Sequence, residues 1–253
     1  MPWNEILLIV LASLRAAGVV MALPMPGGKA LPPMLRVAMA VMLGGFVALA
    51  TSPLTELRIA TTGELIFAFV HELLLGLAMG LVGRAVLSTA DLAGRLIATE
   101  IGLTAAPGFD APTPSQEPLP AFISAFAGMM FFLMGAHEGV LAAFARSFEI
   151  AGPGHGTLGP AAAQTLVGVV AQLIELAVRM AAPFIALNFV ITLGFSILGR
   201  AVPKMNVFIL SYSLRSQLGF LLLAGGGTLL ARYLALAFES LPWRMLELVG
   251  TRG

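Results

Sequence analysis

Cysteine is absent from the 253 residues, and charged residues are scarce. Without cysteine the chain can form no disulfide and no thiolate site for zinc, for an iron–sulfur cluster or for nucleophilic catalysis. Only 11% of the residues are charged, against roughly a quarter in a soluble domain. The formal net charge of +1 supplies no basic field for nucleic acid. These absences argue against soluble, nucleic-acid-binding and thiol-dependent proteins.

Apolar residues are abundant, at 58% of the chain with a mean hydropathy of +0.96. Such a chain lacks the polar surface needed to cover itself in water, so composition predicts an integral protein of a lipid bilayer. The sequence begins Met-Pro-Trp-Asn-Glu before an apolar stretch at 6–14. Because no basic residue precedes that stretch, we expect a retained membrane segment, with Trp3 as its interfacial anchor.

Apolar runs separated by proline- and glycine-rich linkers predict an all-α fold. A spanning helix needs about 20 residues, so the second and fourth runs are short and the sixth and seventh are long. Pro183 is expected to split the sixth run. We therefore expect a polytopic membrane protein with broken and short helices, packed largely against protein. The seven runs are approximately 6–23, 34–50, 64–87, 90–106, 119–145, 161–199 and 205–240.

Loop charges predict a topology. The positive-inside rule places two basic connections in the cytoplasm and leaves the acidic, proline-rich loop 106–120 free to lie opposite. Arg146, at the end of the fifth run, weakens this assignment. The basic connections carry Lys29 and Arg36, and Arg200 and Lys204; the acidic loop carries Asp110 and Glu117.

Two of the apolar segments carry a polar face. At about 100° per residue, each set of polar residues falls within about 80° of the helix circumference. Each set contains an acid four residues before an arginine, a spacing that lets the pair bridge one helical turn. A charge at the bilayer centre costs at least about 2.5 kcal/mol, so we expect these faces to meet another subunit or a water-filled path. A self-neutralised pair that only lowers the insertion cost is the alternative. The sets are Arg84, Ser88, Asp91, Arg95 and Thr99, and Gln164, Gln172, Glu175 and Arg179.

Small residues predict close helix packing in "GLAMGLVG". The segment contains Gly76, Gly80 and Gly83, and the first two have the four-residue spacing that lets helix backbones approach. Glycine is common in membrane helices, so the spacing gains weight mainly from the polar faces beside it.

Catalytic motifs fail on inspection, and we expect no enzyme and no cofactor. "HELLL" (71–75) and "HEGVL" (137–141) lack the second histidine of a zinc protease helix. "GHGTLG" (154–159) matches the dinucleotide glycine pattern by letter, but no strand precedes it. "PGGKA" (26–30) lacks the upstream glycine and the hydroxyl of a P-loop, and Ser124 and Ser147 have no plausible His/Asp partners.

Several features occur in order along the chain. An arginine and a glycine precede a proline-flanked turn, and "HELLLGLAMGLVGR" (71–84) and "MGAHEGVLAAFARSF" (134–148) follow. Then comes "AAPFIALNFVITLGFSILGRAVPKMNVFIL" (181–210). Together these features resemble the FliR family of flagellar export proteins and its SctT counterparts in injectisomes. The residues around the first turn are Arg15, Gly18, Pro24, Pro33 and Arg36.

The last feature is the best match, being similar to the family's Ala-Pro, Gly-x-x-x-Arg and Pro-x-hydrophobic-Asn-hydrophobic-Phe. Two departures bear on the local shape of the turn near its end. Lys204 stands where the family commonly has glutamine, and "SYSLRS" (211–216) lacks a proline that is usual there.

The resemblance implies a component of the flagellar type III export gate, in the bacterial inner membrane and the flagellar basal body. FliP-like and FliQ-like subunits and an FlhB-like protein would be its partners, and unfolded secreted proteins its substrates. The family's helices wind into a helical assembly partly lifted out of the bilayer. The single export-gate domain, 1–253, would then comprise a FliP-like part, 1–160, and a FliQ-like hairpin with a C-terminal segment, 161–253.

The resemblance also implies two candidate sites. Residues 199–206 would form a hairpin turn facing the cytoplasm and the FlhB-like protein, or else an ordinary basic loop. A loop within Gly102–Pro120 would help to close the pore, with Phe109 as its apolar stopper, or else lie outside as a plain loop. The turn residues are Arg200, Pro203, Lys204 and Asn206; the plug residues are Phe109, Asp110, Pro112 and Pro114.

A small-molecule or ion transporter is the alternative from another class. It predicts inverted repeats and ionisable groups that converge on one midplane site. We find no repeat, and the charged residues lie along helix faces. A channel or scaffold without export function is the third possibility.

Overall fold

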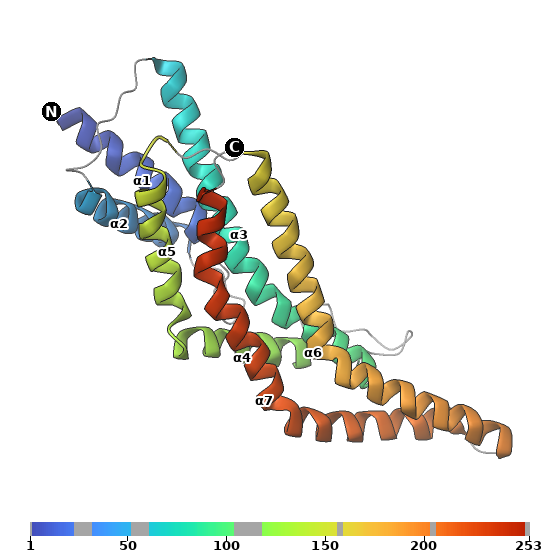
Figure 1. The fold of residues 1–253 in the computed structure, drawn as a ribbon. Helices are drawn as coiled ribbons and strands as arrows, with labels where there is room; N and C mark the ends of the chain where they lie inside the picture. The colour runs from blue at the N-terminus through green and yellow to red at the C-terminus, as the bar shows by residue number, and fades with distance from the viewer. Residues whose placement is uncertain are drawn as a thin grey trace. The chain divides into compact units, whose positions relative to one another are not determined.

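The structure is a computed structural model that describes residues 2–22, 32–51, 61–103, 118–155, 159–202 and 206–250. Within these ranges the elements are all α-helices, in agreement with the predicted all-α class (Figure 1). They are α1 (Pro2–Ala22), α2 (Pro33–Thr51), α3 (Thr62–Glu100), α4 (Pro118–Leu133), α5 (Ala136–Ile150), α6 (Pro160–Ala201) and α7 (Val207–Gly250).

Five of the described helices are long and apolar enough to cross a membrane, and the bent pair of α4 and α5 would make a sixth span. The chain is therefore a polytopic α-helical membrane protein, as composition predicted. Helices α3, α6 and α7 contain 39, 42 and 44 residues. At about 1.5 Å per residue, each extends well beyond the roughly 30 Å of a hydrocarbon core.

Helix boundaries differ from the predicted runs in three places. The third and fourth runs form one continuous helix, α3. The prediction that Pro183 splits the sixth run is wrong, because α6 continues through it. A single proline removes one hydrogen bond, and the bonds on either side preserve a long membrane helix. The fifth run is divided instead, at Gly135, whose φ of +69° lies in the left-handed region.

The chain divides into two compact units. Unit 1 comprises Met1–Leu87, Phe131–Gln172 and Ala237–Gly253, and unit 2 comprises Ser88–Met130 and Leu173–Leu236. Helices α3, α6 and α7 contribute a segment to each unit. Unit 1 is centred on fully buried side chains from three helices, namely Leu11, Leu75, Met79, Leu241 and Met245.

In unit 2, the end of α3 packs against both α4 and α7. A Cβ added to Gly94 would press on the Pro120 backbone, and one added to Gly219 would overlap the Ile101 side chain. Ser216 Oγ also donates a hydrogen bond of 3.0 Å to the Ile101 carbonyl. These contacts fix the α3 terminus within unit 2.

Candidate functional site

A fully buried ion pair connects α1 and α3 inside unit 1. Arg15 and Glu72 both have 0% side-chain exposure. Arg15 Nε donates to Glu72 Oε2 at 2.6 Å, and Nη2 donates to Oε1 at 2.9 Å. This two-pronged arrangement is the strongest geometry between arginine and a carboxylate.

The same pair holds the end of α5 and the turn that follows. Arg15 Nη1 donates to Ser147 Oγ and Nη2 donates to the Ala151 carbonyl, both at 3.0 Å. The Gly154 N–H donates to Glu72 Oε1 at 2.8 Å. Gly154 has a φ of +83°, a conformation that glycine adopts without steric cost. Four segments therefore converge on one charge pair.

An aromatic ring covers the arginine. The Cζ atom of Arg15 lies 3.9 Å from the centre of the Phe148 ring, a cation–π distance. Phe144 meets Phe148 edge to face at 5.3 Å between ring centres. Because water is excluded here, removing either charge would leave the other buried without its counter-ion.

Glycines bring α1 and α3 close enough for the pair to form. A Cβ on Gly18 would overlap the α3 backbone at Gly76 and Leu77, and a Cβ on Gly76 would overlap the Arg15 carbonyl. Gly80 lies against the Val19 backbone in the same way. Gly83 is buried on the same helix. The "GLAMGLVG" segment is thus a surface of direct backbone contact.

Sequence reasoning did not predict this network. Glu72 and Ser147 belong to two segments that carry the family resemblance, and to an incomplete zinc motif and a serine without catalytic partners, but none of these patterns pairs them with Arg15. Arg15 was noted only through the family resemblance. The available signal was a lone charge in an apolar helix, which is costly unless it finds a partner. The partners are separated by 57 residues, a distance that helical periodicity does not relate.

The polar face on α3 forms the expected local pair. Arg95 Nε donates to Asp91 Oδ2 at 2.9 Å, and the two side chains are 41% and 42% exposed. Ser124 on α4 donates to Asp91 Oδ1 at 3.5 Å. Arg84, which belongs to unit 1, is exposed. The structure therefore assigns Arg84 to one compact unit and Asp91 and Arg95 to the other.

The polar face on α6 also forms its pair. Arg179 Nη2 donates to Glu175 Oε1 at 2.5 Å, and the side chains are 63% and 58% exposed. Gln172 has another role, because its Oε1 accepts a 2.6 Å hydrogen bond from Arg244 Nη1 on α7. Whether these faces meet a subunit or a water-filled path stays a prediction.

The structure describes only part of the two loop sites. Arg200 is exposed near the end of α6, and Asn206 precedes α7, where its Oδ1 accepts a 3.4 Å hydrogen bond from the Ile209 N–H. Pro203 and Lys204 lie outside the described residues. So do all four predicted plug residues, Phe109, Asp110, Pro112 and Pro114.

A second polar chain, not predicted from the sequence, lies in unit 2. Asn188 Nδ2 donates to Glu100 Oε2 at 2.6 Å, and Thr192 Oγ1 lies 3.4 Å from Asn188 Oδ1. Arg215 Nη2 donates to Thr192 Oγ1 at 3.0 Å. The neutral Asn188 and Thr192 thus connect an acid on α3 with a base on α7. Among the described residues, no cluster of three His, Asp or Glu side chains could hold a metal ion.

The long apolar helices define the chain as a polytopic α-helical membrane protein. Its apolar helices also carry charges, as a buried pair between α1 and α3 and as exposed pairs on α3 and α6. Residues 6–241 match the family described as Bacterial export proteins, family 1, and the chain belongs to that family. The predicted membership in the FliR family of flagellar export proteins is thereby confirmed.

Relatives support the same assignment over most of the chain. The flagellar biosynthetic protein FliR of Caulobacter vibrioides is 28% identical over 228 residues, covering 87% of this chain and 88% of that protein. FliR of Aquifex aeolicus is 24% identical over 215 residues, covering 85% and 83%. FliR of Bacillus subtilis is 26% identical over 222 residues, covering 85% and 83%.

Proposed function

We propose that this chain is a subunit of the export gate of a bacterial flagellar protein export apparatus, in the inner membrane. There it forms part of the channel through which unfolded proteins leave the cytoplasm. The observation that carries the proposal is the family match over residues 6–241. In addition, the chain is similar to flagellar biosynthetic proteins over most of their length. No residue of this chain is assigned a catalytic role.

Helix length and exposed charge favour a multi-subunit gate. Helices α6 and α7 are too long for simple perpendicular spans, and a helical assembly partly lifted out of the bilayer accommodates such lengths. The pair Glu175–Arg179 is more than half exposed on a helix apolar enough to enter the membrane. Because exposed charge is costly against lipid, a neighbouring protein or a water-filled path is the expected environment.

The finer assignments follow from this function. Residues 1–160 would form the FliP-like part and 161–253 the FliQ-like hairpin with its C-terminal segment. The turn at Arg200, Pro203, Lys204 and Asn206 would face the FlhB-like protein. The loop with Phe109, Asp110, Pro112 and Pro114 would help to seal the channel.

Copurification tests the proposal as a whole. The chain, tagged and extracted in mild detergent from its native host, should be recovered with FliP-like and FliQ-like membrane proteins. Its deletion should abolish secretion of flagellar proteins, and the intact gene should restore it. A chain that purifies alone or as its own oligomer, with secretion unaffected by deletion, would instead fit a small-molecule transporter.

Site-specific photocrosslinking tests the polar face on α6. A photoreactive amino acid in place of Arg179 should crosslink to a second protein of the assembled gate, because that position is expected to meet protein. The same residue in place of Phe46, an exposed apolar side chain on α2, serves as a comparison. Crosslinking of position 179 to lipid acyl chains in the assembled complex would contradict the expected environment.

A further inference from the structure

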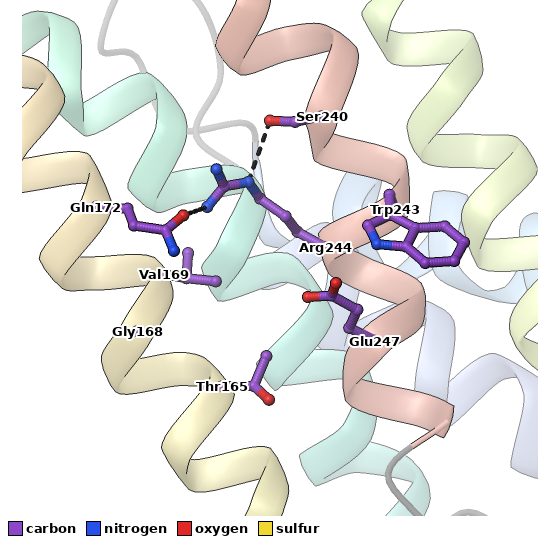
Figure 2. Close-up of a pocket in the computed structure, with 8 residues that line it drawn as sticks. All are labelled: Thr165, Gly168, Val169, Gln172, Ser240, Trp243, Arg244 and Glu247. Atoms are coloured by element: carbon purple, nitrogen blue, oxygen red, sulfur yellow. Dashed lines mark hydrogen bonds between the residues drawn. The ribbon is translucent and has the colours of Figure 1, made fainter.

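A groove in unit 1 lies between the first turns of α6 and the last turns of α7 (Figure 2). Its volume is about 360 Å³, within the range of small-ligand sites. Both helices end nearby, and α7 carries Trp243 there with 68% exposure, a residue typical of membrane–water interfaces. The residues lining the groove are Thr165, Gly168, Val169, Gln172, Ser240, Trp243, Arg244 and Glu247.

Two opposite charges line this groove without pairing with each other. Arg244 and Glu247 are three positions apart on α7, where side chains are about 5–6 Å apart at Cβ and an ion pair is expected. Arg244 instead donates from Nη1 to Gln172 Oε1 at 2.6 Å and from Nε to Ser240 Oγ at 3.1 Å. Figure 2 shows the guanidinium group held toward Gln172 while the Glu247 carboxylate points into the space below it. Gln172 and Ser240 thus keep the two charges separate.

Each charge retains capacity for an external partner. Two acceptors occupy two of the five N–H groups of the Arg244 guanidinium, and the described residues supply no further acceptor. Glu247 is exposed and has no hydrogen-bond or ion-pair partner within the described ranges. A ligand that meets both groups needs an anion and a cation separated by a few ångströms.

We propose that the groove binds the phosphoethanolamine headgroup of a membrane phospholipid. The phosphate would accept hydrogen bonds from the free N–H groups of Arg244, which suits guanidinium geometry. The ammonium would pair with Glu247, one turn along the same helix. The two-carbon linker of the headgroup separates its charges by about the spacing of these side chains. Trp243, which points away from α6 in Figure 2, would mark the interfacial level of the site.

Competitive lipid binding tests the headgroup. The full chain, with its copurifying subunits, is incubated in detergent with equimolar phosphatidylethanolamine and phosphatidylglycerol, and bound lipid is identified by native mass spectrometry. We expect phosphatidylethanolamine to be retained preferentially. Glu247→Gln should reduce its retention about tenfold relative to phosphatidylglycerol, because one charged hydrogen bond is lost. Glu239→Gln, on an exposed residue of α7 outside the groove, should leave the preference unchanged.

A filling substitution gives a second test that does not depend on charge. In the described part of the chain, a Cβ on Gly168 meets no atom within 4 Å, so Gly168→Leu should occupy the groove without disturbing the fold. It should displace the lipid. Gly194→Leu, at a similarly open position on α6 outside the groove, should not.

Three results would overturn the proposal. One is equal retention of the two lipids by the unsubstituted chain, and another is an unchanged preference in Glu247→Gln and Gly168→Leu. The third is crosslinking of a photoreactive residue at position 168 to a protein subunit, which would identify a partner as the occupant. Soluble phosphoethanolamine is added in a parallel sample. Failure to displace the bound lipid supports a membrane source, and displacement at low concentration would contradict it.

Discussion

Substitution of Glu72 by glutamine is expected to reduce strongly the amount of folded protein in the membrane. Glutamine keeps the size of the side chain but leaves the Arg15 guanidinium without a counter-ion in a site with 0% exposure. Breaking a buried pair in this way costs about 3–5 kcal/mol. That amount is a large share of the roughly 5–15 kcal/mol by which a typical domain is stable.

Membrane abundance and thermal unfolding in detergent measure this effect. Glu149→Gln is the matched control, because Glu149 is exposed on α5 directly after Phe148, which covers Arg15. The control should retain normal abundance and unfolding temperature. Equal behaviour of the two variants would show that the ion pair contributes little to the fold.

Replacing both charges distinguishes the contribution of the pair to folding stability from a role in export. Arg15→Met combined with Glu72→Met should be more stable than either single substitution, because an apolar pair of similar volume avoids an isolated buried charge. The Gly154 N–H would still lose its acceptor, so recovery should be partial. Normal export by a stable double variant would restrict the pair to a structural role. A double variant less stable than Glu72→Gln would contradict this account.

Local interactions were the part of the site that could be predicted from the sequence. The pairs Asp91–Arg95 and Glu175–Arg179 depend only on a four-residue spacing within one helix, and both form. The pair Arg15–Glu72 depends on how α1 packs against α3. The sequence does not show which residues of the two helices lie opposite each other. A lone charge in an apolar helix indicates that a partner exists but does not identify it.

The fold class followed from composition, whereas the helix boundaries depended on backbone conformation. The polar residues Ser88 and Asp91 interrupt the hydropathy of α3, yet the helix continues because their side chains need not disrupt the backbone hydrogen bonds. Pro183 likewise removes one bond from α6 without ending it. By contrast, α4 ends at Leu133 and α5 begins at Ala136, next to Gly135 in its left-handed conformation. Backbone conformation, rather than hydropathy, sets these boundaries.

Alanine at two glycine positions is expected to change stability in opposite directions. Gly76→Ala adds a Cβ that overlaps the Arg15 carbonyl, and backbone atoms on two packed helices cannot move aside as a flexible side chain can. Overpacking costs about 1–3 kcal/mol, and here it would also separate the helices that carry the ion pair. Gly45→Ala places its Cβ where the described chain has no atom within 4 Å. It should stabilise by up to about 1 kcal/mol, because alanine is the better helix former.

The unfolding temperatures of the two alanine variants in detergent test this contrast. Both substitutions add one methyl group to a membrane helix, so general effects of hydrophobicity and insertion are matched. A lower temperature for Gly76→Ala and an equal or higher one for Gly45→Ala are expected. If Gly76→Ala is as stable as Gly45→Ala, then α1 and α3 are not in backbone contact at this position. In that case the close approach that positions Arg15 against Glu72 must have another cause.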